Sequence, residues 1–220
     1  MNIKGKDVKA IIFDLDGTLI DSNDVWKKVD EEFFAKRNRK IPKGYVEAIS
    51  HVGLFEAALI TINKFNIQGE PNAIIEEWKN SAYQMYANEV KLKPYVKEFL
   101  DKLKKEKIYI AIATACNKDL YIPCLKNRKI YDYFDIIADV DDVKEGKNSA
   151  KIYQFISTKL NVPPSKTVVV EDISIGLKSA YESGYLTIGI YDKSFSFDDE
   201  NKKKYSYLYI NSFQELLKLN

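Results

Sequence analysis

The chain has little of the residues that metal-binding and hydrolytic sites most often use. Its 220 residues include one histidine, His51, and two cysteines, Cys116 and Cys124. A single histidine excludes a multi-histidine zinc site and argues against a Ser-His-Asp hydrolase. Two cysteines provide neither a disulfide framework nor a metal-ligand spacing. The chemistry of this chain must therefore rest on carboxylates, hydroxyls and lysines.

Arginine and long apolar runs are also scarce. Only 3 of the 34 basic residues are arginines, and 32 acidic residues leave a net charge of +2. This balance, with so few guanidinium groups, disfavours nucleic-acid binding. The longest apolar run, Ile108–Ala113, is far shorter than the ~20 residues that span a bilayer, and residues 1–10 contain no apolar signal core. We expect a soluble, cytoplasmic protein that binds neither nucleic acid nor membranes and is monomeric by default.

The length corresponds to about one and a half average domains. Apolar residues recur at helical spacing through residues 19–92, whereas short apolar runs alternate with helical patterns after residue 93. This organisation predicts an α/β fold with a doubly wound, mostly parallel, Rossmann-like sheet. Residues 1–18 and 93–220 would form that core domain, and residues 19–92 would form an inserted helical-bundle cap. The lysine run 202–204 is expected to be a solvated loop.

Polar residues capable of catalysis or ligand binding follow the expected strands. The first strand ends in Asp14-Leu15-Asp16-Gly17-Thr18, and residues two apart in an extended chain point to the same side. In open parallel sheets the ligand crevice lies beyond the carboxyl ends of the strands. We therefore expect this segment to meet the residues that follow the later strands, which are Thr114, Ala115, Cys116 and Asn117, then Lys147, and finally Glu171 and Asp172.

These motifs, in this order, resemble the haloacid dehalogenase (HAD) superfamily. Within it, the chain is similar to the capped phosphatase and phosphomutase branch, which includes phosphoglycolate-phosphatase-like and β-phosphoglucomutase-like proteins. The resemblance covers nearly the whole chain and includes Asp21-Ser22 after the first motif and Gly176 after the last. It implies a Mg²⁺-dependent phosphoric monoester hydrolase that acts on a small phosphorylated metabolite through an aspartyl-phosphate.

The chemistry of phosphoryl transfer suggests a role for each carboxylate, and the roles known for the family agree. Asp14 is the expected nucleophile, because a carboxylate is ionised at neutral pH and can form an aspartyl-phosphate. Asp16 is expected to protonate the leaving alkoxide and then to deprotonate the attacking water. Mg²⁺ would be held by Asp14, Asp172 and the backbone carbonyl of Asp16. Glu171 is expected to lie in the layer of residues outside these ligands and to support them.

The remaining candidates would bind the phosphoryl group. Lys147 would neutralise the phosphoryl oxygens and steady Asp14, and the Thr114 hydroxyl would bind a further oxygen. The other expected contacts to the phosphate group come from Thr18, Ala115, Cys116 and Asn117.

Two departures from the family pattern bear on specificity. Asn148 follows Lys147 where many relatives have proline, and no arginine lies between Arg39 and Arg128. His51 and Gly53 are therefore the candidate specificity residues of the cap. The missing arginine disfavours a substrate with a second phosphate. A sugar-phosphate mutase is thus the alternative enzyme, and a phosphate-sensing, receiver-like module is the non-enzymatic alternative.

Overall fold

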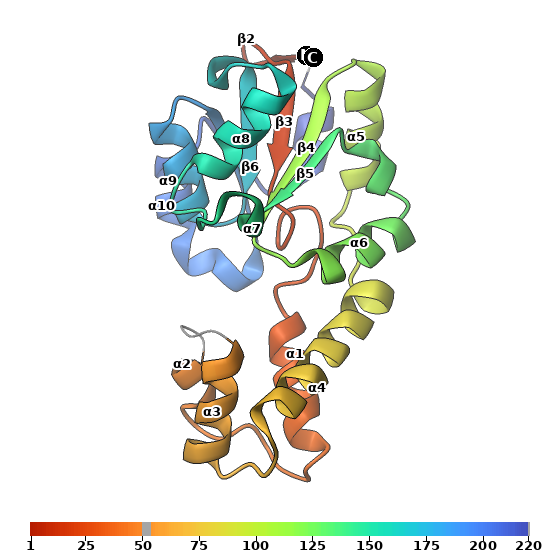
Figure 1. The fold of residues 1–220 in the computed structure, drawn as a ribbon. Coiled ribbons are helices and arrows are strands. Elements are labelled where there is room, and N and C mark those ends of the chain that lie inside the picture. The colour runs from red at the N-terminus through yellow and green to blue at the C-terminus, as the bar shows by residue number, and fades with distance from the viewer. Residues whose placement is uncertain (50–53, 220) are drawn as a thin grey trace. The chain divides into compact units, whose positions relative to one another are not determined.

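The computed structural model describes residues 1–49 and 54–219. By its internal contacts the chain divides into two compact units. One unit comprises Met1–Asn23 and Val90–Asn220, and the other is the intervening segment Asp24–Glu89 (Figure 1). The functional division into a core of residues 1–18 and 93–220 and a cap of residues 19–92 stays a prediction.

A six-stranded parallel sheet forms the centre of the first unit. Its order is β5-β4-β3-β6-β7-β8. The first strand of the sheet, β3, therefore lies in the middle. The next two strands, β4 and β5, lie on one side of it, and β6, β7 and β8 lie on the other. The first unit therefore has the predicted doubly wound α/β fold, whose crevice lies beside the strand where the order reverses. The strands are β3 (Ala10–Phe13), β4 (Tyr109–Thr114), β5 (Ile136–Asp139), β6 (Thr167–Glu171), β7 (Leu186–Ile190) and β8 (Leu208–Ile210).

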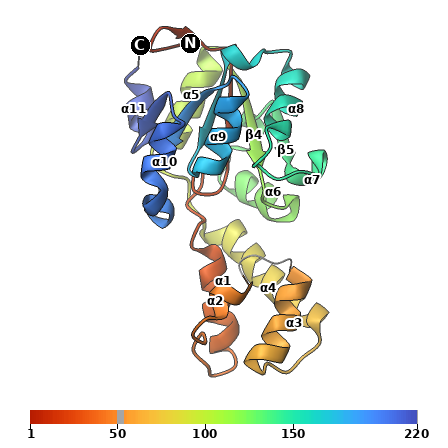
Figure 2. The ribbon, with the colours of Figure 1, turned by 90° about the vertical axis from the view of Figure 1, so that its left-hand side faces the viewer.

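Both faces of this sheet are covered by helices, which explains why its central strands are continuous apolar runs. Phe13 of β3 packs against Phe99 and Phe213 on one face, with ring centroids 6.2 and 6.0 Å away. Its neighbour Ile12 belongs to the opposite cluster, which includes Tyr153. Figure 2 shows helices on both sides of the sheet. The helices of this unit are α5 (Val96–Lys105), α6 (Lys118–Asn127), α7 (Val140–Val143), α8 (Lys151–Leu160), α9 (Ser174–Glu182), α10 (Asp199–Lys204) and α11 (Phe213–Leu217).

The lysine run 202–204 lies in α10, so the expectation of a solvated loop is wrong. The Lys202 side chain is fully buried, and its Nζ lies 2.7 Å from Oδ1 of Asp199. Residues three apart in a helix face each other, so the two charges pair along one side of α10. Acidic residues in its first turn and lysines in its last turn also complement the helix dipole. A short hairpin of β1 (Asn2–Ile3) and β2 (Lys6–Asp7) was not predicted either.

The second unit is a helical bundle, as the periodicity predicts. It contains α1 (Val25–Ala35), α2 (Tyr45–Ile49), α3 (Leu54–Phe65), α4 (Pro71–Gln84) and a π-helical turn, Met85–Glu89. Its interior is a chain of aromatic contacts with ring centroids 4.7 to 5.5 Å apart, formed by Phe33, Phe34, Tyr45, Phe65 and Trp78. Trp26, Phe55 and Tyr83 are exposed.

None of the helices in the described ranges combines the length and the apolar character that crossing a membrane requires.

Candidate active site

The register of β3 and β6 places two carboxylates side by side. Phe13 pairs with Val170 in the parallel ladder, and the Asp14 N–H donates to the Val170 carbonyl over 2.9 Å. Asp14 and Glu171 therefore leave the two central strands at the same level. The Asp14 side chain is 8% exposed, and that of Glu171 is fully buried.

Lys147 supplies the positive charge between these carboxylates. Its Nζ donates to Oδ1 of Asp14 and, over 2.8 Å, to Oε1 of Glu171. Burial alone would lower the pKa of Lys147, but the charges of Asp14 and Glu171 outweigh it and raise that pKa. The buried lysine is therefore charged, and it is paired with both carboxylates, which such a site requires.

Asp172 completes an acidic cluster with Asp14 and Glu171. One carboxylate oxygen from each residue lies within 4.8 Å of the other two. Burial, followed by the charge of Asp14, raises the pKa values of Glu171 and Asp172. These shifts reflect burial of clustered acids that, among the described residues, pair with the ammonium of Lys147, so the cluster favours an additional positive charge.

Two oxygens of the cluster have the properties of open ligand positions. Oδ2 of Asp14 and Oε2 of Glu171 are buried and have no hydrogen-bond partner among the described residues. A buried acceptor without a partner is costly, and a bound cation removes that cost. Carboxylate oxygens are ligands for hard divalent cations such as Mg²⁺. The cluster therefore fits the divalent cation that the sequence predicts.

Asp16 lies in the turn after β3 and is oriented by a serine. The Oγ atom of Ser22 donates to Oδ1 of Asp16 over 2.5 Å. The turn depends on Gly17, whose φ of +78° disfavours other residues and where a Cβ atom would lie 2.1 Å from Oδ2 of Asp172. The same oxygen of Asp172 accepts a hydrogen bond from Nδ2 of Asn23 over 3.1 Å.

The end of β4 provides hydroxyl and backbone groups. Thr114 is fully buried, and its Oγ1 accepts from the Cys116 N–H over 2.9 Å, which leaves the hydroxyl proton available to donate. Asn117 caps α6 by accepting from the Asp119 N–H over 2.9 Å. Ala115 in this turn is exposed.

The structure brings some of the predicted site residues into direct contact and places others in neighbouring segments. Asp14, Lys147, Glu171 and Asp172 form the cluster. Thr114, Ala115, Cys116 and Asn117 form the turn after the neighbouring strand, β4. Thr18 is fully buried, and no described residue bonds its Oγ1. His51 and Gly53, the candidate specificity residues, lie outside the described residues.

Three residues of the site environment were not predicted from the sequence. The sequence indicates Ser22 only as part of the Asp21-Ser22 motif, although the Ser22 hydroxyl donates directly to Asp16. Asn23 contacts Asp172 across 149 positions of the chain, which no local pattern indicates. The Tyr153 hydroxyl donates to Oε1 of Glu171 over 3.1 Å. Tyr153 lies in α8, an amphipathic helix whose sequence pattern does not indicate this contact.

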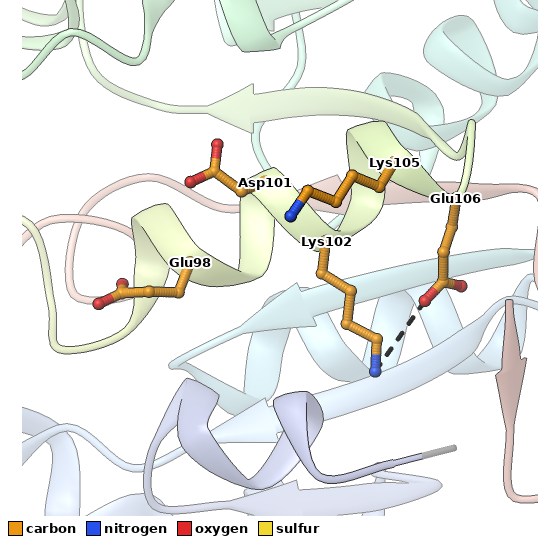
Figure 3. Close-up of a pocket in the computed structure, with 5 residues that line it drawn as sticks. All are labelled: Glu98, Asp101, Lys102, Lys105 and Glu106. Carbon is orange, nitrogen blue, oxygen red and sulfur yellow. Dashed lines mark ion pairs between the residues drawn. The ribbon is translucent and has the colours of Figure 1, made fainter.

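A hollow along α5 is unrelated to this cluster. Its lining is charged (Figure 3), and it measures about 410 Å³. Lys102 pairs there with Glu106 at 4.0 Å and donates to the Leu219 carbonyl over 2.6 Å. These contacts attach the C-terminal segment to α5, which is a structural role. The lining residues are Glu98, Asp101, Lys102, Lys105 and Glu106.

Comparison with known proteins agrees with this fold. Residues 11–190 match the model of the haloacid dehalogenase-like hydrolase family. The chain belongs to this family, and it is accordingly an enzyme.

Individual relatives of this chain carry different names, and they include a phosphatase and a mutase. A "Phosphorylated carbohydrates phosphatase" of Thermotoga maritima is 28% identical over 184 residues, which cover 80% of this chain and 82% of the relative. A "Beta-phosphoglucomutase" of Bacillus subtilis is 27% identical over 193 residues, covering 83% of each chain.

Solved structures show the same fold. A crystal structure from Thermotoga maritima has a TM-score of 0.83 at 24% identity and covers 96% of this chain and 97% of its own. The CbbY structure from Rhodobacter sphaeroides, in complex with phosphate, has a TM-score of 0.70 at 25% identity. It covers 95% of this chain and 96% of its own.

Proposed function

We propose that this protein is a Mg²⁺-dependent phosphoric monoester hydrolase that acts on a small phosphorylated metabolite through an aspartyl-phosphate. The main support is the arrangement of Asp14, which is buried, held at Oδ1 by Lys147 and without a described partner at Oδ2. An ionised carboxylate with one oxygen fixed and the other open is suited to nucleophilic attack. Relatives named as phosphatases support the choice of reaction.

In the first half-reaction, one carboxylate oxygen of Asp14 attacks the phosphorus atom. A bond forms between this oxygen and phosphorus, and the bond from phosphorus to the ester oxygen breaks. The Lys147 ammonium offsets the negative charge that gathers on the phosphoryl oxygens. Asp16 gives its proton to the departing alkoxide, and the Ser22 hydroxyl holds the Asp16 carboxyl in place through Oδ1.

In the second half-reaction, water attacks the aspartyl-phosphate. Asp16 takes a proton from that water, the bond between phosphorus and Asp14 breaks, and inorganic phosphate leaves. The Thr114 hydroxyl donates to one phosphoryl oxygen in both half-reactions. Further contacts to these oxygens are proposed for Thr18, Ala115, Cys116 and Asn117.

The residues proposed to hold Mg²⁺ are Asp14, Asp172 and the backbone carbonyl of Asp16. Glu171 lies in the same acidic cluster, and its unpartnered Oε2 qualifies it as a further ligand. When bound, Mg²⁺ supplies positive charge that reduces the repulsion between a carboxylate nucleophile and an anionic phosphate.

A sugar-phosphate mutase is the alternative function, because relatives include a β-phosphoglucomutase. A mutase keeps the phosphate on its substrate, whereas a phosphatase releases it. The absence of arginine between Arg39 and Arg128 favours the phosphatase, since a second phosphate would need a further cationic partner. A cytoplasmic location and a monomeric state, expected from the sequence, stay predictions.

The test is phosphate release from an aryl phosphate, followed by a panel of phosphorylated sugars, sugar acids and nucleotides. We expect release that requires Mg²⁺, stops with EDTA and is lost in Asp14→Asn. Activity that survives both EDTA and Asp14→Asn would refute the proposal. Isomer formation from a sugar phosphate without net phosphate release would identify the mutase instead.

A further inference from the structure

Glu171 is held by two donors on the same oxygen. Its Oε1 accepts from Lys147 over 2.8 Å and from the Tyr153 hydroxyl over 3.1 Å. Its other oxygen, Oε2, has no hydrogen-bond partner in the described part of the chain. The two donors therefore hold Oε1 and leave Oε2 for another partner, such as the cation that the acidic cluster fits.

Tyr153 is itself tightly held and takes no direct part in the proposed reaction. It is fully buried on α8, with its ring 6.0 Å from the ring of Tyr185. A Cβ atom at Gly176 would lie 2.5 Å from Oε1 of Glu171 and 3.0 Å from the Tyr153 hydroxyl. The backbone of α9 therefore lies close against both the carboxylate and the hydroxyl.

The backbone of Lys147 is anchored from the same direction. The Ser179 hydroxyl on α9 lies 2.8 Å from the Lys147 carbonyl and 3.1 Å from the Gly176 carbonyl of its own helix. A serine within a helix ordinarily bonds its own preceding turn. Here the shorter contact is to the loop that carries the catalytic lysine.

We propose that Tyr153 and Ser179 are positioning residues for the buried pair of Lys147 and Glu171. The Tyr153 hydroxyl orients the Glu171 carboxylate so that Oε2 faces the acidic cluster, and the Ser179 hydroxyl fixes the Lys147 backbone. This proposal rests on the phosphatase function proposed above. It adds two groups that touch neither the substrate nor the reacting atoms.

The first test compares Tyr153→Phe with a matched control, Tyr185→Phe. Both changes remove one hydroxyl from a buried tyrosine of the same core cluster. Among the described residues, the Tyr185 hydroxyl makes no hydrogen bond to the site, whereas the Tyr153 hydroxyl bonds Glu171. The first measurement is the melting temperature as a function of MgCl₂ concentration, which reports Mg²⁺ binding without any substrate.

We expect Tyr153→Phe to raise the half-saturating Mg²⁺ concentration by about tenfold or more, because partners behind metal ligands commonly contribute this much. Its kcat on the aryl phosphate should fall by a similar factor of about ten, with a smaller change in KM. Tyr185→Phe should stay within about twofold of the wild type in each measurement.

Ser179→Ala tests the second contact independently. We expect its kcat to fall by about fivefold, since it loses a hydrogen bond that holds the catalytic lysine. Its half-saturating Mg²⁺ concentration should stay within about twofold of the wild type, because the Ser179 hydroxyl bonds the backbone carbonyls of Lys147 and Gly176 and not a carboxylate. An unchanged kcat would remove Ser179 from the proposal.

The role of Tyr153 is refuted if Tyr153→Phe matches the wild type in both measurements. It is equally refuted if Tyr185→Phe weakens Mg²⁺ binding as much, since the effect would then belong to core packing. Failure of the phosphatase proposal gives a different result, in which the wild type itself releases no phosphate. The Mg²⁺ titration still decides the role of Tyr153 in that case.

Discussion

The Nζ atom of Lys147 lies 2.8 Å from Oε1 of Glu171 and also donates to Oδ1 of Asp14. This lysine is the cationic side chain that contacts the acidic cluster within the described part of the chain. Asp172 adds a third carboxylate to the group. Lys147 therefore matters to stability as well as to the proposed catalysis, because removing it leaves the buried carboxylates without a compensating charge.

Replacing Lys147 by methionine should therefore damage activity and stability together. Methionine keeps most of the length of the side chain but removes its charge, and breaking a buried pair in this way costs about 3–5 kcal/mol. We expect phosphate release to be lost and the free energy of unfolding in EDTA to fall by about 3 kcal/mol. Urea unfolding with and without Mg²⁺ measures the change, and Mg²⁺ should restore part of it.

The control for this variant is Lys151→Met. Lys151 is an exposed lysine of α8 that pairs with Glu145 at the surface. Surface pairs contribute about 0–1 kcal/mol, so its stability and activity should remain close to those of the wild type. Equal destabilisation by the two variants would show that the buried contacts of Lys147 have no special weight.

Replacing Ser22 by alanine should impair the proton transfers proposed for Asp16. The variant loses the 2.5 Å hydrogen bond that orients the Asp16 carboxyl. We expect kcat to fall by about tenfold for an alkyl phosphate, whose leaving group needs a proton. The loss should be smaller for an aryl phosphate that departs as a stable phenolate. Steady-state rates on both substrates check this, and an equal loss on both would count against an orienting role.

Replacing Asn23 by alanine should weaken Mg²⁺ binding. Asn23 donates to Oδ2 of Asp172 over 3.1 Å, and losing such a partner of a metal ligand costs roughly tenfold in affinity. The increase of the melting temperature with MgCl₂ measures the affinity. Asn88→Ala is the control, since Asn88 bonds Gln84 within the second unit. Unchanged Mg²⁺ affinity in Asn23→Ala would disprove this role.

Asp30 of α1 gives a prediction about stability alone. Burial, with a contribution from the charge of Glu31, raises the pKa of Asp30 to about 6. Because the folded pKa exceeds the unfolded one, the neutral form stabilises the fold at low pH, and this stabilisation is lost as the pH rises through about 6. Asp30→Asn should therefore raise the free energy of unfolding at pH 7.5 by about 1–2 kcal/mol.

The same substitution should have little effect near pH 4, where the Asp30 carboxyl is already protonated in the folded protein. Urea unfolding at the two pH values tests the difference. Glu76→Gln, an exposed position on α4, is the control and should change stability at neither pH. A gain for Asp30→Asn that is the same at both values would contradict the role assigned to burial.

The sequence predicts the sheet and the acidic strand ends because their signals are local. Apolar runs followed by Asp14 or Glu171 identify central strands and polar ends, and parallel pairing then places those ends together. The contacts of Tyr153 and Asn23 follow from tertiary packing between distant segments, so no spacing indicates them. The solvated loop predicted for residues 202–204 is wrong because charge alone indicates solvent exposure, whereas Lys202 is buried and pairs with Asp199 at helical spacing.

The central claim is that Asp14 carries the phosphoryl group. The most direct measurement uses Asp16→Asn with an aryl phosphate, which needs no proton to depart, so that the aspartyl-phosphate forms but its hydrolysis is slow. The reaction is quenched in acid, and peptide mass mapping locates the added group. The account predicts one phosphoryl group on the peptide that contains Asp14, removable by hydroxylamine, and none when Asp14→Asn is added. Phosphate release by Asp14→Asn at the wild-type rate, with no labelled peptide, would contradict it.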